Sequence, residues 1–263
     1  MKGSIVWIIS VILIVYLGLC GWLWLRQRSL IYYPTPSVSN PLAEELLLES
    51  DREVLQIWRV SQGNEHAVIY FGGNAEDVSQ NSAEFLRYLD DLTVYLVNYR
   101  GYGGSSGSPA ESGLFLDALS VYDFVARQHA EISVIGRSLG SGVATYLAAA
   151  RTTKRLVLVT PFDSLDRVAQ AAFPLFPVSL LMQDRFDSLG RANRIRVPTL
   201  IMIAEHDEII ARGHSENLAA AIDPSLLKVT VIDGAGHNTI GSLPEYERLL
   251  SAFLRGKTDA HQD

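Results

Sequence analysis

"SVIGRSLGSG" (residues 133–142) joins an apolar run typical of a buried strand to a series of small residues typical of a packed helix. A strand that turns directly into a helix leaves no space for side chains two positions before and after the bend. We therefore expect Gly136 and Gly140 to be required on either side of Ser138. Gly-x-Ser-x-Gly in this setting is typical of a nucleophile elbow, which lifts a serine hydroxyl above the edge of a sheet.

Short runs rich in Val, Ile, Leu and Tyr recur along the rest of the chain, and most lack apolar–polar alternation, as expected of strands buried on both faces. These runs cover residues 54–60, 67–71, 93–99, 132–136, 155–160, 199–204 and 228–233. Helical patterns lie between them at about 79–90, 113–128, 139–151, 211–222 and 244–255. The alternation predicts an α/β fold, with a mostly parallel central sheet and helices on both faces.

A serine hydroxyl needs a base and an orienting acid to act as a nucleophile. Of the six histidines, His237 lies in a glycine-containing loop just beyond a predicted strand, in "VIDGAGHN". Asp207 follows the strand at 199–204 and gives the chain order serine, acid, histidine that is typical of this architecture. We therefore predict Ser138, Asp207 and His237 as a catalytic triad; the acids left as alternatives are Glu205, Glu208 and Asp163.

Backbone N–H groups are expected to stabilise the oxyanion that develops during attack by the serine. One comes from Leu139, the residue after the serine, and a second from the loop "GGNAED" at 72–77, which follows the strand at 67–71. Gly72 and Gly73 let the backbone approach a substrate closely, so that the N–H of Asn74 becomes the second donor.

The N-terminal segment is apolar enough to act as an anchor. Residues 3–25 contain no charge and are long enough to cross about 30 Å of hydrocarbon. Lys2 precedes the segment, and Arg26 and Arg28 follow it, which leaves the orientation open. We predict an uncleaved single-pass anchor, because no cleavage site of small residues follows; a cleaved signal peptide and lipidation at Cys20 are the alternatives.

Composition separates the chain into an anchor at 1–28, a proline-rich linker at 29–41, a folded domain at 42–256 and a polar tail at 257–263. Within the domain, residues of about 162–195 form a short predicted cap that contains "AFPLFPVSLLM". This apolar stretch either lines an acyl pocket, touches lipid or simply packs on the sheet.

The charge pattern narrows the choice of partners. A net charge of −7 without a cluster of Lys and Arg argues against binding to nucleic acid. The single cysteine, Cys20, excludes an internal disulfide and a cysteine-based zinc site, and we expect neither a metal nor an organic cofactor. Arg100 and Arg137 either bind an anionic group or form structural ion pairs.

Together these motifs resemble the α/β-hydrolase superfamily, and within it the membrane-anchored, Bem46-like serine hydrolases that include mammalian ABHD-type depalmitoylases. The resemblance extends from about residue 31 onward and includes "NYRGYGGSSGSP" at 98–109, "DRFDSL" at 184–189 and "HDEII" at 206–210. One position departs from the family pattern: where the family usually has the histidine of His-Gly-Asn, this chain has Gly72.

The residues and the resemblance predict a membrane-anchored serine hydrolase that cleaves ester or thioester bonds through an acyl-enzyme. The anchor favours small-molecule or lipid-like substrates with acyl chains, and we expect it in a bacterial inner membrane. The oligomeric state is left open. The alternatives are a serine peptidase of the same fold and a non-catalytic, membrane-tethered interaction protein.

Overall fold

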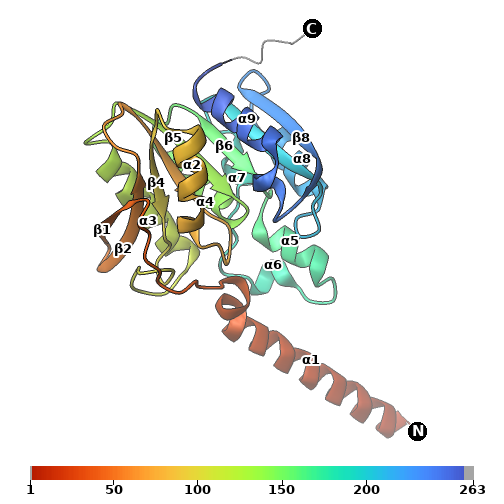
Figure 1. Ribbon diagram of the computed structural model, residues 1–263. Coiled ribbons are helices and arrows are strands. Elements are labelled where there is room, and N and C mark those ends of the chain that lie inside the picture. The colour runs from red at the N-terminus through yellow and green to blue at the C-terminus, as the bar shows by residue number, and fades with distance from the viewer. Residues whose placement is uncertain (1, 258–263) are drawn as a thin grey trace.

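The computed structural model describes residues 2–257, so residues 258–263 of the predicted tail lie outside the described part of the chain. Within it, eight strands form one sheet in the order β1-β2-β4-β3-β5-β6-β7-β8 (Figure 1). The β1–β2 and β2–β4 pairs are antiparallel and the remaining pairs are parallel, which confirms the mostly parallel α/β sheet. The strands are β1 (Glu44–Ser50), β2 (Glu53–Val60), β3 (His66–Phe71), β4 (Thr93–Val97), β5 (Glu131–Arg137), β6 (Leu156–Val159), β7 (Thr199–His206) and β8 (Leu227–Gly236).

Helices cover both faces of the sheet, as the alternation of strand and helix predicts. Successive residues of β3 point into two separate cores, with Ile69 in one and Tyr70 in the other. Both side chains are fully buried, and burial of such a side chain stabilises the fold by about 1.5–3 kcal/mol. The first core is covered by α3 (Glu111–Val125), α4 (Leu139–Ala150) and α8 (Arg212–Ala220), and the second by α2 (Ser82–Tyr88) and α9 (Pro244–Leu254).

The sequence pattern does not predict β1, which lies at the edge of the sheet. Leu46 and Leu48 are partly buried against the first core, whereas Leu47 between them is 68% exposed. A strand with one solvated face and several acidic residues lacks the continuous apolar run by which the central strands are recognised.

Three short helices lie between β6 and β7, in the segment expected to form a cap. They are α5 (Leu165–Ala172), α6 (Val178–Leu181) and α7 (Leu189–Ala192). Helices α5 and α6 lie beside the end of the N-terminal helix, whereas α7 packs against α4 (Figure 1).

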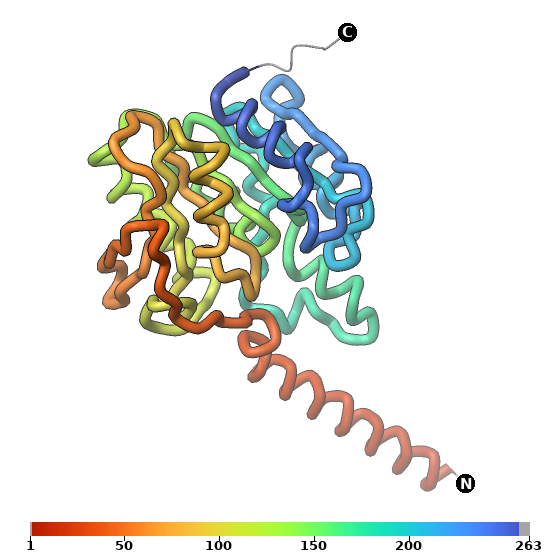
Figure 2. The backbone as a smooth tube through the Cα atoms, viewed as in Figure 1, coloured from red at the N-terminus to blue at the C-terminus, as the bar shows by residue number. Residues whose placement is uncertain are grey.

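The N-terminal helix α1 (Lys2–Ile31) runs away from the domain, with its C-terminal end next to the cap (Figure 2). Among the described residues, it is the one helix that is long and apolar enough to cross a membrane. The helix continues to Ile31, so residues 29–31 of the predicted linker are helical. The rest of that linker is extended and packed on the domain: the Gly103 N–H donates to the Thr35 carbonyl (3.0 Å), and the Asn40 amide donates to Ser82 (2.7 Å).

Candidate active site

The turn between β5 and α4 holds Ser138 in a strained conformation, with φ 49° and ψ −116°. A Cβ atom added at Gly136 would overlap with the Gly140 carbonyl oxygen. A Cβ added at Gly140 would overlap with the Phe71 carbonyl oxygen at the end of β3. The two glycines therefore allow a sharp turn and, in the case of Gly140, close contact between α4 and a neighbouring strand.

Ser138, His237 and Asp207 lie in line at the carboxyl edge of the sheet. The Ser138 Oγ is 2.9 Å from His237 Nε2, and His237 Nδ1 is 2.9 Å from both carboxylate oxygens of Asp207. Because a carboxylate only accepts, this geometry places a proton on Nδ1, and in that tautomer of the imidazole Nε2 is the atom that can accept from the serine hydroxyl. The His237 and Asp207 side chains are 4% and 3% exposed, which shields this pair from water.

Strand register explains why the acid and the histidine meet. In the β7–β8 pair, His206 lies opposite Gly236 after a bulge, so the next residues, Asp207 and His237, leave the sheet side by side. The Asp207 carboxylate also accepts from the Ile209 and Ile210 N–H groups (3.0 and 2.7 Å), which fix its orientation.

The three alternative acids have other partners. Asp163 accepts from Ser164 N–H (2.7 Å) and lies 2.8 Å from His214 Nδ1, so it belongs to a second, separate Asp–His pair. Glu205 accepts from the Gly234 N–H (2.8 Å). Glu208 accepts from the His237 N–H (3.1 Å), and so holds the backbone of the histidine rather than its ring.

The loop after β3 lies against the nucleophile, because Phe71 pairs with Gly136 in the β3–β5 register. A Cβ placed on Gly73 would be 3.6 Å from Ser138 Cβ. The backbone N–H groups of Asn74 and Leu139 donate to no other group of residues 2–257, and both residues line the cavity beside Ser138. Two unpaired donors next to the serine are the arrangement that an oxyanion hole requires.

Comparisons with known proteins agree with this fold. Residues 66–180 match the family model of the alpha/beta hydrolase fold. An uncharacterized protein of Mycobacterium tuberculosis is 35% identical over 248 residues, which cover 88% of this chain and 87% of that protein. The chain belongs to the α/β-hydrolase family.

Relatives with more informative names are more distant. Alpha/beta hydrolase domain-containing protein aho-3 of Caenorhabditis elegans is 29% identical over 73% of this chain and 58% of its own length. An esterase from Pyrococcus furiosus has a TM-score of 0.70 at 20% identity, with 86% of this chain and 99% of that chain covered. At this identity the esterase shows the fold alone, and the family supports a hydrolase.

In this α/β hydrolase, Glu76 lies beside Gly72 and braces the loop that follows β3. Its carboxylate accepts from the Gly73 N–H (2.6 Å), the Tyr70 hydroxyl (2.7 Å) and Arg137 (2.9 Å), which holds the loop after β3 in place. Burial, together with the charge of Glu76, raises the pKa of Tyr70 well above its usual value, so the hydroxyl remains a donor. The sequence analysis missed Glu76; its one signal is an acid three residues after Gly73.

Both arginines singled out in the sequence form structural ion pairs. Arg137 binds Glu76, and Arg100 binds Asp117 through two bonds of 2.7 Å from Nε and Nη2. The Asp117 hydrogen bonds raise the pKa of Arg100. Neither arginine lines the cavity at Ser138.

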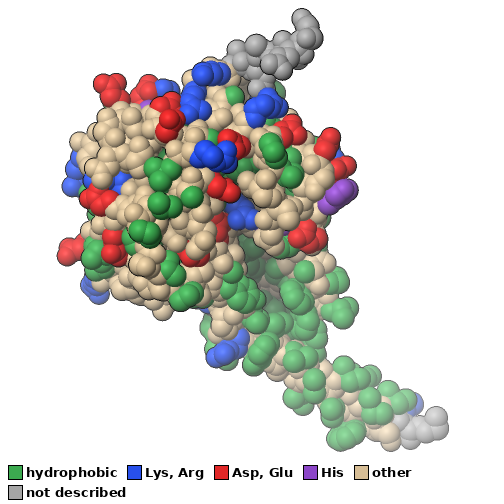
Figure 3. Space-filling model, viewed as in Figure 1, with side chains coloured by type: hydrophobic (Ala, Val, Ile, Leu, Met, Phe, Trp, Pro, Cys, Tyr) green, Lys and Arg blue, Asp and Glu red, His purple; other side chains and the backbone are tan. Residues whose placement is uncertain are grey.

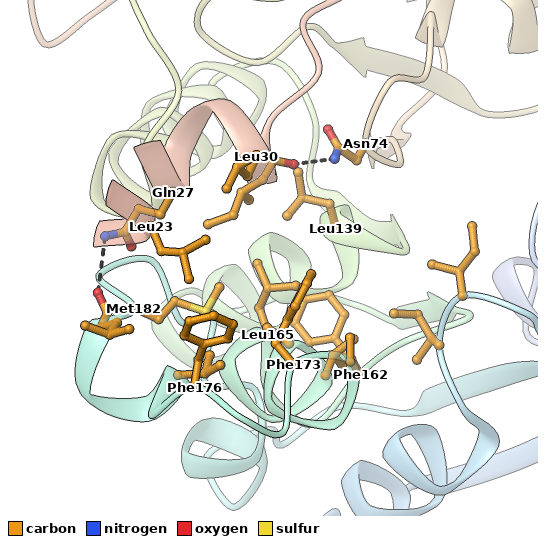
Figure 4. Close-up of a pocket in the computed structure, with 18 of the residues that line it drawn as sticks. Leu23, Gln27, Leu30, Asn74, Leu139, Phe162, Leu165, Phe173, Phe176 and Met182 are labelled. Atoms are coloured by element: carbon orange, nitrogen blue, oxygen red, sulfur yellow. Dashed lines mark hydrogen bonds between the residues drawn. The ribbon is translucent and has the colours of Figure 1, made fainter. Parts of the chain in front are cut away.

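A largely apolar cavity of about 440 Å³ opens beside Ser138 (Figure 4). One wall comes from the cap and includes Phe162, Phe173 and Phe176, so the apolar cap stretch does line a pocket. The opposite wall comes from α1, which the sequence analysis treated only as an anchor. The α1 residues that line the cavity are Leu23, Gln27, Leu30 and Ile31.

The close contact at Gly140 predicts that Gly140→Ala destabilises the protein by about 1–3 kcal/mol, since α4 must move away from β3. Gly213→Ala in α8 is the matched control, because a Cβ there meets nothing within 4 Å. We expect it to be neutral or to stabilise by less than about 1 kcal/mol. Urea unfolding of the full-length variants in detergent measures both effects, and equal stabilities would contradict the packing described at the elbow.

Proposed function

We propose that this chain is a membrane-anchored serine hydrolase that cleaves carboxylic ester or thioester bonds through Ser138, His237 and Asp207. The observation that carries the proposal is the unbroken series of 2.9 Å contacts from Ser138 Oγ through the imidazole to the Asp207 carboxylate, at one end of an apolar cavity. The long, exposed and apolar α1 supports membrane attachment.

The proposed cycle begins when His237 Nε2 takes the proton of Ser138 while Oγ attacks the carbonyl carbon. The negative charge that develops on the carbonyl oxygen is stabilised by the N–H groups of Asn74 and Leu139. Asp207 stabilises the imidazolium that forms. Collapse of the tetrahedral intermediate breaks the ester or thioester bond, and His237 returns its proton to the leaving alcohol or thiol.

The acyl-enzyme is then hydrolysed by the same groups. Water loses a proton to His237 Nε2 and attacks the acyl carbonyl, and the second tetrahedral intermediate releases a carboxylic acid as Ser138 regains its proton. Glu76 acts in both halves as a positioning residue, because it holds the Gly73 N–H and thereby the conformation of the loop that carries the Asn74 donor.

The shape of the cavity favours an acyl chain over a peptide. Its walls are aliphatic and aromatic, and its polar side chains are few: Gln27, Tyr33, Asn74 and Ser138. A peptide would bring several backbone donors and acceptors into this space, and they would lose their hydrogen bonds to water without replacement. An alkyl chain has no such groups and gains from leaving water.

An alkyl fluorophosphonate probe tests the nucleophile directly. We expect the wild-type protein to be labelled at Ser138 and the Ser138→Ala variant to remain unlabelled, with mass spectrometry of the modified peptide as the readout. Wild-type enzyme that has not been treated with the probe should hydrolyse p-nitrophenyl acyl esters faster than peptide p-nitroanilides, and labelling should abolish both activities. Faster amide cleavage would favour a serine peptidase, and absence of labelling in a folded protein would favour a non-catalytic interaction protein.

The two buried Asp–His pairs provide a matched test of the acid. Asp207→Asn should lower kcat for ester hydrolysis by about 10⁴-fold, because an amide facing Nδ1 no longer favours the reactive tautomer. Asp163→Asn makes the same carboxylate-to-amide change in the Asp163–His214 pair, which does not contact His237. We expect this variant to keep kcat within about tenfold of the wild-type value. The reverse ranking would assign the acid to Asp163.

A further inference from the structure

The anchor helix is built into the cavity rather than merely attached to the domain. In Figure 4, Leu23 and Leu30 on α1 face Phe173 and Phe176 of the cap across the space that leads to Ser138. A helix that served only as a tether would need no side chains there.

Polar contacts fix α1 against the cap on this side. The Gln27 amide nitrogen donates to the Leu181 carbonyl (3.2 Å), and its oxygen accepts from the Gln183 N–H (2.7 Å). The next residue, Arg28, pairs with the buried Asp184 (3.1 Å). These contacts fix the orientation of α1 about its own axis. The side of the helix that carries Leu23, Gln27 and Leu30 therefore faces the cavity.

The end of α1 is also joined to the oxyanion loop. The Asn74 amide donates to the Ile31 carbonyl, which has no partner within the helix, and its oxygen accepts from the Tyr33 N–H (3.0 Å) and the Tyr102 hydroxyl (2.7 Å). The position of α1 and the position of the Asn74 donor are therefore linked through one side chain.

Contacts between α1 and the cap extend deep into the apolar segment. Tyr16 stacks on Phe176, with ring centroids 5.9 Å apart, and its hydroxyl donates to the Leu175 carbonyl (3.0 Å). The part of α1 before Tyr16 is only about 21 Å long at 1.5 Å per residue, which is too short to cross about 30 Å of hydrocarbon. If α1 spans the bilayer, the residues beside Tyr16 share the hydrocarbon with it.

The cap surface beside Tyr16 is uncharged and apolar, as a surface in contact with hydrocarbon must be. Residues 168–183 contain no charged side chain. Phe173, Leu175 and Leu180 are 56%, 81% and 81% exposed, an apolar surface that is costly in water and stable in lipid. Figure 3 shows hydrophobic side chains continuing from α1 onto the adjoining end of the domain, whereas charged side chains gather at the opposite end.

We propose that the tip of the cap, residues 173–181, is immersed in the membrane beside α1. In this arrangement α1 and the cap form one acyl-chain site, which takes the chain of a membrane amphiphile from the lipid leaflet to Ser138. The chain passes from hydrocarbon into an apolar cavity without crossing water, so little desolvation opposes its entry. The catalytic part of this inference rests on the proposed hydrolase function, and the immersion of the cap does not.

Immersion is tested without any enzyme activity. Full-length Leu175→Cys in a Cys20→Ser background, labelled with a nitrobenzoxadiazole fluorophore and reconstituted in phosphatidylcholine vesicles, should be quenched by lipids that carry nitroxide on the acyl chain. Leu47→Cys is the control, because Leu47 is also exposed but lies on β1 at the sheet edge. We expect strong quenching at position 175 and none at position 47, and equal signals at the two positions would overturn the immersion.

The wall formed by α1 is tested with a bulky side chain. Leu23→Trp and Leu30→Trp should lower kcat/KM for p-nitrophenyl laurate relative to p-nitrophenyl acetate by about tenfold or more, since the added ring occupies the space of the chain. Leu25→Trp places the same ring on the same helix at a position that is 73% exposed and outside the cavity, and it should leave the ratio unchanged.

The two proposals fail in different ways. If the variants hydrolyse both esters with the wild-type ratio, α1 does not form the acyl site and the inference falls, while the serine hydrolase function stands. If folded wild-type protein neither hydrolyses the esters nor reacts with the fluorophosphonate, the hydrolase function falls and the acyl site falls with it.

Discussion

The contact on which the site depends is the approach of α4 to the carbonyl end of β3, which is possible only because position 140 has no side chain. This contact sets the start of α4, with the Leu139 N–H, beside the loop that carries the Asn74 N–H. Ser138, two residues before this contact, has a positive φ, so a strained residue and a close contact between elements occur in the same turn. A looser turn would relax the serine and separate the two donors.

The remaining parts of the site follow from parallel pairing, which brings the carboxyl ends of strands to one edge. For this reason, the position of a residue directly after a predicted strand is enough to predict most of the site. Ser138, Asp207 and His237 each follow a segment that reads as a strand, so each can be assigned to the same edge without knowledge of the contacts. The position after the strand at 199–204 favours Asp207. The contact that rules out Asp163 depends on the bulge in β8 and on the pairing of His206 with Gly236, which no pattern in the sequence reveals.

The features that the sequence does not disclose depend on contacts between distant segments. Glu76 appears in the sequence as one acid in a polar loop. Its four hydrogen bonds come from Tyr70, Gly73 and Asn81 nearby in the chain and from Arg137 at the end of β5. The cavity-facing side of α1 is hidden for a different reason. The helix is apolar on all sides, so its periodicity cannot separate residues that face lipid from those that face the cap. The edge strand β1 is missed because half of it is solvated.

The contacts of α1 bear on whether the anchor is retained. A signal peptide leaves the mature protein, and its removal here would take away Leu23 and expose the apolar faces of Phe173 and Phe176 to water. It would also leave the Leu175 carbonyl without the Tyr16 hydroxyl. Several polar and apolar groups of the domain thus have their contact partners on α1. This arrangement favours retention of the helix over its cleavage as a signal peptide. The hydrogen bond from the Asn74 amide to the Ile31 carbonyl is a further contact of the domain that removal of the helix would break.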